Sequence, residues 1–352
     1  MTSPAGHAYV DATPVPPAVS PYPWDVAAAR WRLERLRADL PVRVPADAAF
    51  RGGNSNDVWM FDDLVVRVRV CWRGDRDRLL REAAVLGALP PGVPHAPLVD
   101  VGRTDDVSWT VTGLVTGSPL DVVADRLPIT AARGLYADMA GVLQELHSWR
   151  PPASLRSLVT DRPGMRSDDQ LSIWASDLMP LPVSRALTMI DLAAGLRYVD
   201  PALVKDTRQR IVELATADPF ADPQASTSVV HADATPGNFL VHNGKISALL
   251  DFEWVRWAPP DHELVSLVRM AQPQTGPVGR TMPRLPILAW LAEDYPGLFT
   301  HPDLDRRLWL SEIVYVLHGV IWWPPDQPES TLTPAHHVHT LRRLVESPWP
   351  YR

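Results

Sequence analysis

The sequence is poor in cysteine, in long apolar runs and in excess positive charge, and each shortage excludes a class of protein. Cys71 is the one cysteine among 352 residues, so a secreted scaffold held by internal disulfides is excluded. No apolar run approaches the roughly 20 residues that cross a bilayer, which excludes a membrane-spanning protein. The formal net charge is −7, whereas a general nucleic-acid binder would present a basic face.

The N-terminal residues show no targeting signal. Met1–Val10 lack the basic and apolar regions of a signal peptide, so we expect a cytoplasmic protein. Residues 11–23 are rich in proline and small residues, which predicts an extended arm, either a plain tail or a segment that docks on a partner. The chain is longer than a typical single domain, and we expect two lobes with a sizeable core.

The spacing of apolar residues predicts where the two lobes begin and end. We expect an arm and a helix in 1–46, a small β-rich lobe in 47–118 and a mainly helical lobe in 119–352. In the first 120 residues the patterns predict helices over 24–40 and 76–89, three strands within 48–70, and further strands at 97–101 and 108–115. The later helices are expected over 133–149, 186–199, 201–215, 260–270, 286–294 and 303–321.

One non-helical island, residues 228–253, carries the residues best suited to chemistry. It reads SVVHADATPGNFLVHNGKISALLDFE and predicts strand ends around a loop, then a hairpin that turns at 242–245. Asn238 and Asp251 offer oxygen ligands of the kind that Mg²⁺ prefers. Asp233 lies on the same loop as Asn238 and can accept a proton from an attacking hydroxyl. Together these residues are typical of phosphoryl transfer from a metal-bound nucleotide.

The island resembles the aminoglycoside phosphotransferase and choline-kinase-like family of the protein-kinase-like fold. The stretches HADATPGN and LLDFEW match its signature in residue type and in spacing. The resemblance implies a two-lobed α+β protein with a small antiparallel sheet and one helix in the N-terminal lobe and a larger, mainly helical C-terminal lobe. It also implies a kinase that uses ATP and Mg²⁺ and transfers the γ-phosphate to a hydroxyl. Asp233 would be the catalytic base, His231 would brace its loop, and Asn238 and Asp251 would hold the metal.

The resemblance extends to the predicted nucleotide site in the N-terminal lobe. RGGNSNDVW looks like the family's phosphate loop, and LVVRV places Arg67 where the family carries the residue that pairs with the phosphates. Glu82 matches the helix glutamate that pairs with that cation. The nucleotide-binding residues implied in this way are Gly52, Gly53, Ser55, Asn56, Arg67 and Glu82, with Thr112 and Leu114 in the segment that would hold adenine.

Two features depart from the family pattern. The phosphate-pairing residue is usually a lysine, yet here it is Arg67, and Arg69 is the competing candidate because it lies two residues further along the same strand. After Asp251 the family usually has Asp-Leu-Ala, whereas this chain has Pro260-Asp261-His262-Glu263-Leu264. We expect Asp261 to keep the structural role of bracing the catalytic loop.

The acceptor is the least defined part of the prediction. Trp254, Trp257 and Glu253 follow the metal aspartate and are candidates for the acceptor site, since rigid aromatic faces hold sugars, cations or peptide side chains. The first expectation is a small molecule such as an aminoglycoside-like antibiotic. A second is a Ser or Thr hydroxyl on a ribosomal natural-product precursor peptide, with phosphorylation before elimination by a partner lyase. A third, of another class, is a nucleotide-binding partner protein without turnover. We expect neither nucleic acid nor membrane as a partner.

Overall fold

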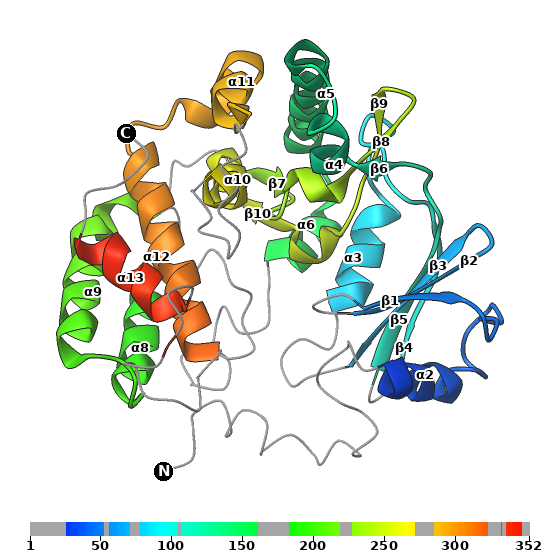
Figure 1. The fold of residues 1–352 in the computed structure, drawn as a ribbon, viewed down its shortest axis with the longest axis horizontal. Coiled ribbons are helices and arrows are strands. Elements are labelled where there is room, and N and C mark those ends of the chain that lie inside the picture. Colours follow the sequence, from blue (N-terminus) through cyan, green and yellow to red (C-terminus); the bar gives the residue numbers. More distant parts are fainter. Residues whose placement is uncertain are drawn as a thin grey trace. The chain divides into compact units, whose positions relative to one another are not determined.

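The computed structural model describes residues 26–52, 56–70, 78–104, 107–160, 183–218, 227–271, 285–322, 332 and 336–346 (Figure 1). These residues form two compact units. One, the sheet unit, holds the described residues up to Thr160 together with Asp233–Val255; the other, the helical unit, holds those from 183 to Ala232 and from Arg256 onward. The predicted boundary at residues 118 and 119 is therefore not where the contacts divide, because 119–160 and 233–255 belong to the sheet unit.

The sheet unit is built on an antiparallel sheet with the strand order β1-β2-β3-β5-β4. A short turn joins β2 to β3, and Asp62 in this turn has a positive φ of 47°, which aspartate tolerates better than most residues. The strands are β1 (Ala49–Gly52), β2 (Asp57–Phe61), β3 (Leu64–Val70), β4 (Leu98–Arg103) and β5 (Val107–Gly113).

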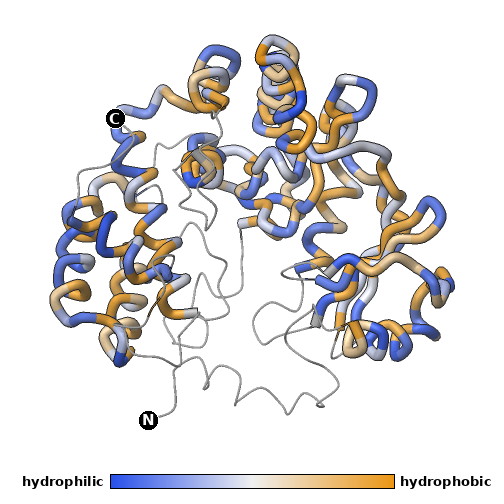
Figure 2. The backbone as a smooth tube through the Cα atoms, viewed as in Figure 1, coloured by the Kyte–Doolittle hydropathy of each residue, from blue (hydrophilic) through white to orange (hydrophobic). Residues whose placement is uncertain are grey.

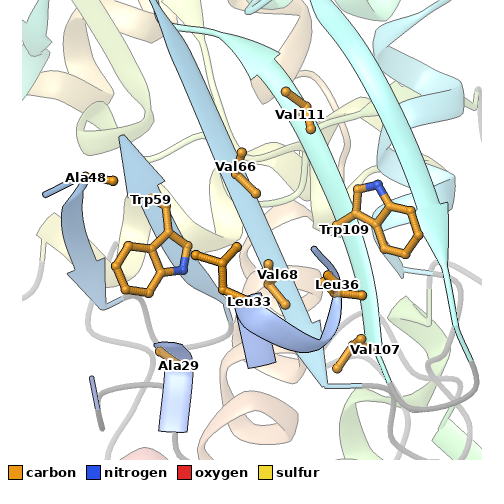
Figure 3. Packing of buried hydrophobic residues seen from close by; sticks show 10 residues of the cluster. All are labelled: Ala29, Leu33, Leu36, Ala48, Trp59, Val66, Val68, Val107, Trp109 and Val111. Atoms are coloured by element: carbon orange, nitrogen blue, oxygen red, sulfur yellow. The ribbon is translucent and has the colours of Figure 1, made fainter. Parts of the chain in front are cut away.

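The two faces of β3 have different partners because side chains alternate along a strand. Val66 and Val68 are buried on one face, where α2 (Val26–Arg35) supplies Ala29 and Leu33. Figure 3 shows this cluster, with Trp59 and Trp109 on neighbouring strands. Arg67 and Arg69 alternate with these valines and point to the opposite face. The strand thus fixes a hydrophobic core on one side of the sheet and a row of cations on the other.

The rest of the sheet unit consists of helices and a second, small sheet. Helix α3 packs on β4, β5 and η3, and α5 packs on β9. Both hydrophobic and hydrophilic residues lie along α5 (Figure 2), and its buried residues recur with helical spacing on one face. The helices are α3 (Arg78–Leu86), α4 (Leu120–Ala124), α5 (Ile129–Ser148), α6 (Ala153–Thr160), η2 (Pro236–Asn238) and η3 (Phe252–Trp254). The small sheet has the order β6 (Ser118–Pro119), β8 (Phe239–His242) and β9 (Lys245–Leu249).

The helical unit holds the remaining described helices and one pair of short strands, β7 (Ser228–Val230) and β10 (Arg256–Ala258), which are antiparallel. Helix α12 packs on α8, α9, α10 and α13 and is the central helix of this unit. The helices are α8 (Val183–Ala194), α9 (Pro201–Leu214), η1 (Ala215–Ala217), η4 (Pro260–Glu263), α10 (Leu264–Ala271), α11 (Ile287–Asp294), η5 (Pro296–Phe299), α12 (Leu304–Trp322) and α13 (His337–Glu346).

Most predicted elements are present, and the differences lie at their ends. The described part of the first helix ends at Arg35 rather than at residue 40, and β5 stops at Gly113 instead of continuing to Val115. The first residues of the predicted helix 260–270 form the 3₁₀ helix η4 (Pro260–Glu263). The arm over residues 11–23 lies outside the described residues. None of the described helices combines the length and the apolar composition that crossing a bilayer requires.

Candidate active site

The β8–β9 hairpin brings together Asn238, which precedes β8, and Asp251, which follows β9. Phe239 lies opposite Leu249 in this hairpin. Beyond this pair, Asn238 and Leu250 lie opposite each other, and the backbone N–H of Leu250 donates a hydrogen bond to the carbonyl oxygen of Asn238 at 2.8 Å. Asp251 follows immediately and adopts a left-handed conformation with φ 67° and ψ 55°, which turns the chain out of the hairpin. Two oxygen-bearing side chains therefore start from adjacent positions at the hairpin end.

The loop before β8 links Asp233 to Asn238. The Asn238 Nδ2 atom donates to the Asp233 carbonyl at 2.8 Å and to the Asp233 carboxylate at 3.2 Å. The Thr235 N–H donates to the same carbonyl at 2.7 Å, and the short helix η2 completes the loop. Because Asn238 uses its amide nitrogen in this way, its Oδ1 atom is the one it offers to a cation. The loop holds the predicted base and one predicted metal ligand in a fixed relation.

Arg67 joins the sheet to both the helix and the hairpin end. Its Nη1 atom donates to Glu82 of α3 at 2.6 Å, and its Nη2 atom donates to Asp251 at 2.8 Å. Burial alone would lower the pKa of Arg67, but Glu82, Asp251 and Glu253 together raise it, so the guanidinium stays charged. Burial raises the pKa of Glu82, and the charge of Arg67 opposes that rise. The pair between Arg67 and Glu82 that the sequence indicated is present; its contact with phosphate stays a prediction.

Glu253 has surroundings that the sequence did not indicate. It was a candidate for the acceptor site, but its side chain is only 3% exposed and lies among cations. Asn56 and Arg69 donate to its Oε2 atom at 3.3 and 3.4 Å, and Arg78 lies 3.9 Å from Oε1. The Arg78 guanidinium also lies 4.2 Å from the centre of the Trp254 ring. These contacts place Glu253 within the unit's charged interior and cover one face of Trp254 with a cation.

The backbone just before Asp233 is held by Glu263 rather than by Asp261. The two carboxylate oxygens of Glu263 accept the backbone N–H groups of His231 and Ala232, at 2.8 and 2.9 Å. Ala232 has a positive φ of 65°, so this backbone is held in a conformation that alanine rarely adopts. Asp261 instead accepts from Arg307 of α12, at 3.2 and 3.3 Å. The bracing role expected for Asp261 thus falls to the residue two positions later.

The remaining predicted residues are spread over both units. Gly52 ends β1 and pairs with Asp57, while Gly53 and Ser55 lie outside the described residues. Thr112 is buried on β5, and the Leu114 N–H donates to the carbonyl of Asp63 at 2.7 Å. Trp257 lies on β10 in the helical unit, whereas Trp254 belongs to the sheet unit. Nothing in these contacts assigns an acceptor to either tryptophan.

Residues 47–298 match the model of a family described as the phosphotransferase enzyme family. This match covers well over half of the chain. The chain belongs to that family. It is an enzyme of the kinase class, a phosphotransferase with an alcohol group as acceptor.

Solved structures similar to this phosphotransferase are aminoglycoside phosphotransferases. The ADP-bound APH(2'')-Ib structure is 15% identical, with a TM-score of 0.60 over 89% of this chain and 97% of that chain. The streptomycin–ATP complex of APH(2")-IIa is 14% identical, with a TM-score of 0.59 over 90% and 95%. A ternary complex of an APH(4)-Ia variant with ADP and hygromycin B is 16% identical, with a TM-score of 0.56 over 89% and 97%. No curated protein sequence matches the chain.

These likenesses confirm the predicted fold of the phosphotransferase, a protein-kinase-like α+β fold with an antiparallel sheet in the N-terminal part and a mainly helical remainder. At such low identity they establish the fold alone. The roles of individual residues rest on their geometry in this chain.

Proposed function

We propose that this phosphotransferase transfers the γ-phosphoryl group of Mg-ATP to a hydroxyl of a small, cationic molecule of the aminoglycoside kind. The observation that carries the proposal is the convergence of Asn238, Asp251 and Arg67. The hairpin places the first two side by side, and Arg67 contacts Asp251 while it is held by Glu82. Oxygen ligands beside a fixed guanidinium form a site for a metal-bound polyphosphate.

The donor atoms fit Mg²⁺. Asn238 offers an amide oxygen and Asp251 a carboxylate whose side chain is 36% exposed, and both are hard ligands. Bound there, Mg²⁺ would neutralise charge on the phosphates. Arg67 would pair with phosphate oxygens through the donors that now contact Asp251, while Glu82 keeps its orientation. Arginine has a rigid fork of donors, so it suits two phosphate oxygens at once.

Asp233 is the proposed base. In the transfer, the acceptor oxygen forms a bond to the γ-phosphorus, and the bond from that phosphorus to the β,γ-bridging oxygen breaks, which releases ADP. The hydroxyl proton passes to the Asp233 carboxylate. The hydrogen bonds from Asn238 orient Asp233, and the Glu263 brace fixes the backbone just before it. Most of the rate gain is expected from positioning and charge stabilisation.

The acceptor class is supported by the solved relatives and by local charge. Complexes of two structural relatives hold streptomycin and hygromycin B, which are aminoglycoside antibiotics. Between Val229 and Leu264 this chain carries five acidic residues against two fixed cations, Lys245 and Arg256; the acidic residues are Asp233, Asp251, Glu253, Asp261 and Glu263. An acidic surrounding attracts a polycationic acceptor.

The test is a phosphate-transfer screen with Mg-ATP, read by the mass of the product. The panel contains aminoglycosides, other hydroxylated antibiotics and Ser/Thr peptides, and it is run with the wild type and with Asp233→Ala in parallel. We expect an aminoglycoside to gain one phosphoryl group with the wild type and none with the variant. A product only on peptides would replace the small-molecule acceptor by a peptide hydroxyl. Nucleotide binding without any product would favour a binding protein without turnover.

A further inference from the structure

Glu253 stands out because it is a buried carboxylate that the proposed reaction does not use. It contacts residues from three separate parts of the sheet unit: Asn56 before β2, Arg69 on β3 and Arg78 at the start of α3. Its side chain is 3% exposed. A carboxylate is seldom buried unless cations or hydrogen bonds compensate it, so these contacts are needed to keep it there.

The same cations lie close to the predicted metal ligand. Arg67 Nη2 reaches both Asp251, at 2.8 Å, and Glu253, at 3.9 Å, so the two carboxylates are near neighbours. Arg69 Nη1 contacts the Glu253 oxygen that faces Arg67, at 3.4 Å. Without the charge of Glu253, the neighbouring Asp251 carboxylate, which Arg67 already contacts, would become a partner to which these arginines can turn. An aspartate engaged by further arginines is a poorer ligand for a cation.

We propose that Glu253 is a positioning residue that holds Arg69 and Arg78 and thereby keeps the Asp251 carboxylate available to a divalent cation. The inference rests on the proposed role of Asp251. It explains why the residue two positions after Asp251 is acidic and buried. It also separates the two arginines of β3: Arg67 serves the phosphates, whereas Arg69 balances Glu253.

The test measures Mn²⁺ binding in the presence of ATP by electron paramagnetic resonance, in the full chain. Mn²⁺ replaces Mg²⁺ as the probe, and the readout does not depend on turnover. We expect Glu253→Gln to weaken Mn²⁺ binding about tenfold, because coupled neighbouring charges commonly interact at about that level. We expect the double variant Glu253→Gln with Arg69→Met to recover most of the affinity, since the competing cation is gone.

A control variant and the wild type separate a failure of this inference from a failure of the proposed function. Leu33→Ala removes a buried side chain of the sheet unit's core far from Glu253 in the sequence, so it should lower the thermal stability without changing Mn²⁺ affinity. A double variant that binds Mn²⁺ more weakly than Glu253→Gln would show a merely structural role and overturn the inference. Unchanged affinity in Glu253→Gln would overturn it as well. If the wild type itself binds no Mn²⁺ with ATP, the proposed function fails instead.

Discussion

At the scale of single residues, an arginine in place of the usual lysine changes the contacts made in the proposed nucleotide site. Arg67 contacts two carboxylates through two different nitrogens, Nη1 to Glu82 and Nη2 to Asp251. A lysine has a single ammonium on a flexible stem, so it would replace the two separate donor nitrogens by one point charge. The guanidinium therefore links α3, β3 and the hairpin end, in addition to any contact it makes with phosphate.

We accordingly predict that Arg67→Lys lowers kcat/KM for ATP by about 10- to 100-fold, because it removes one of two charge-assisted hydrogen bonds and shifts the charge. Steady-state kinetics at varied ATP concentration measures the change. Arg69→Lys is the matched control on the same strand and should cost less, since Arg69 contacts Glu253. A larger loss in Arg69→Lys than in Arg67→Lys would assign the phosphates to Arg69.

The brace of the catalytic loop is a second feature of single residues. Glu263 is fully buried and accepts two backbone N–H groups, so its ionised form satisfies both donors. Glu263→Gln replaces one carboxylate oxygen by an amide nitrogen, which cannot accept a hydrogen bond. We predict that kcat falls about tenfold while KM for ATP changes by less than about twofold, because the loss is one of orientation rather than of nucleotide contacts. Full activity of Glu263→Gln would remove the brace from the mechanism.

The sequence predicts most residues of the candidate site but not how they are paired. The strands of 48–70 and the hairpin at 242–245 follow from local alternation and turn residues, so they were predictable. Asp261 and Glu263 lie two positions apart in a 3₁₀ turn, and sequence alone does not tell which of them faces the loop. Likewise the arginines around Glu253 come from segments distant in the chain, so only the fold reveals its burial.

At the scale of elements, a buried ion pair fastens α2 to the sheet. Arg32 donates to both carboxylate oxygens of Asp57, at 2.6 and 2.8 Å, and both side chains are 1% exposed. Removing one partner leaves an uncompensated buried charge, and we predict that Asp57→Ala destabilises the chain by about 3–5 kcal/mol. Urea unfolding followed by fluorescence measures this. The apolar pair Arg32→Met with Asp57→Leu should recover most of the loss; an equal loss in both would contradict the explanation.

The packing of α12 against α13 depends on a glycine. A Cβ added at Gly319 would lie 2.7 Å from ring atoms of His337. We predict that Gly319→Ala destabilises the chain by about 1–3 kcal/mol, because the helices must separate or the ring must move. Gly141→Ala in α5 is the matched control, since its Cβ meets open space, and it should be neutral or stabilise by up to about 1 kcal/mol. Thermal melting compares the two, and equal effects would refute the steric argument.

At the scale of the whole molecule, the residues of the candidate site and a histidine with a shifted pKa belong to different units. Asp233, Asn238, Asp251, Arg67 and Glu82 all belong to the sheet unit, although 119–160 and 233–255 come from beyond the predicted boundary. The helical unit contains the half-buried His337, at the start of α13. Titration of His337 is therefore expected to make the stability of the chain depend on pH, independently of any titration at the candidate site.

Burial, followed by the charges of His336 and Arg269, lowers the pKa of His337 below its ordinary 6.5. The unfolded chain therefore binds more protons than the folded chain as the pH falls through that value, so acid favours unfolding. The stability that neutral His337 provides is present above about pH 6.5 and is lost below it, at no more than about 1.4 kcal/mol per pH unit. We predict that Tm falls between about pH 7.5 and about pH 5.5, and that the fall is smaller in His337→Gln, which does not titrate. Differential scanning calorimetry of both proteins at each pH measures this difference, and an identical fall in the two would assign the acid sensitivity to other groups.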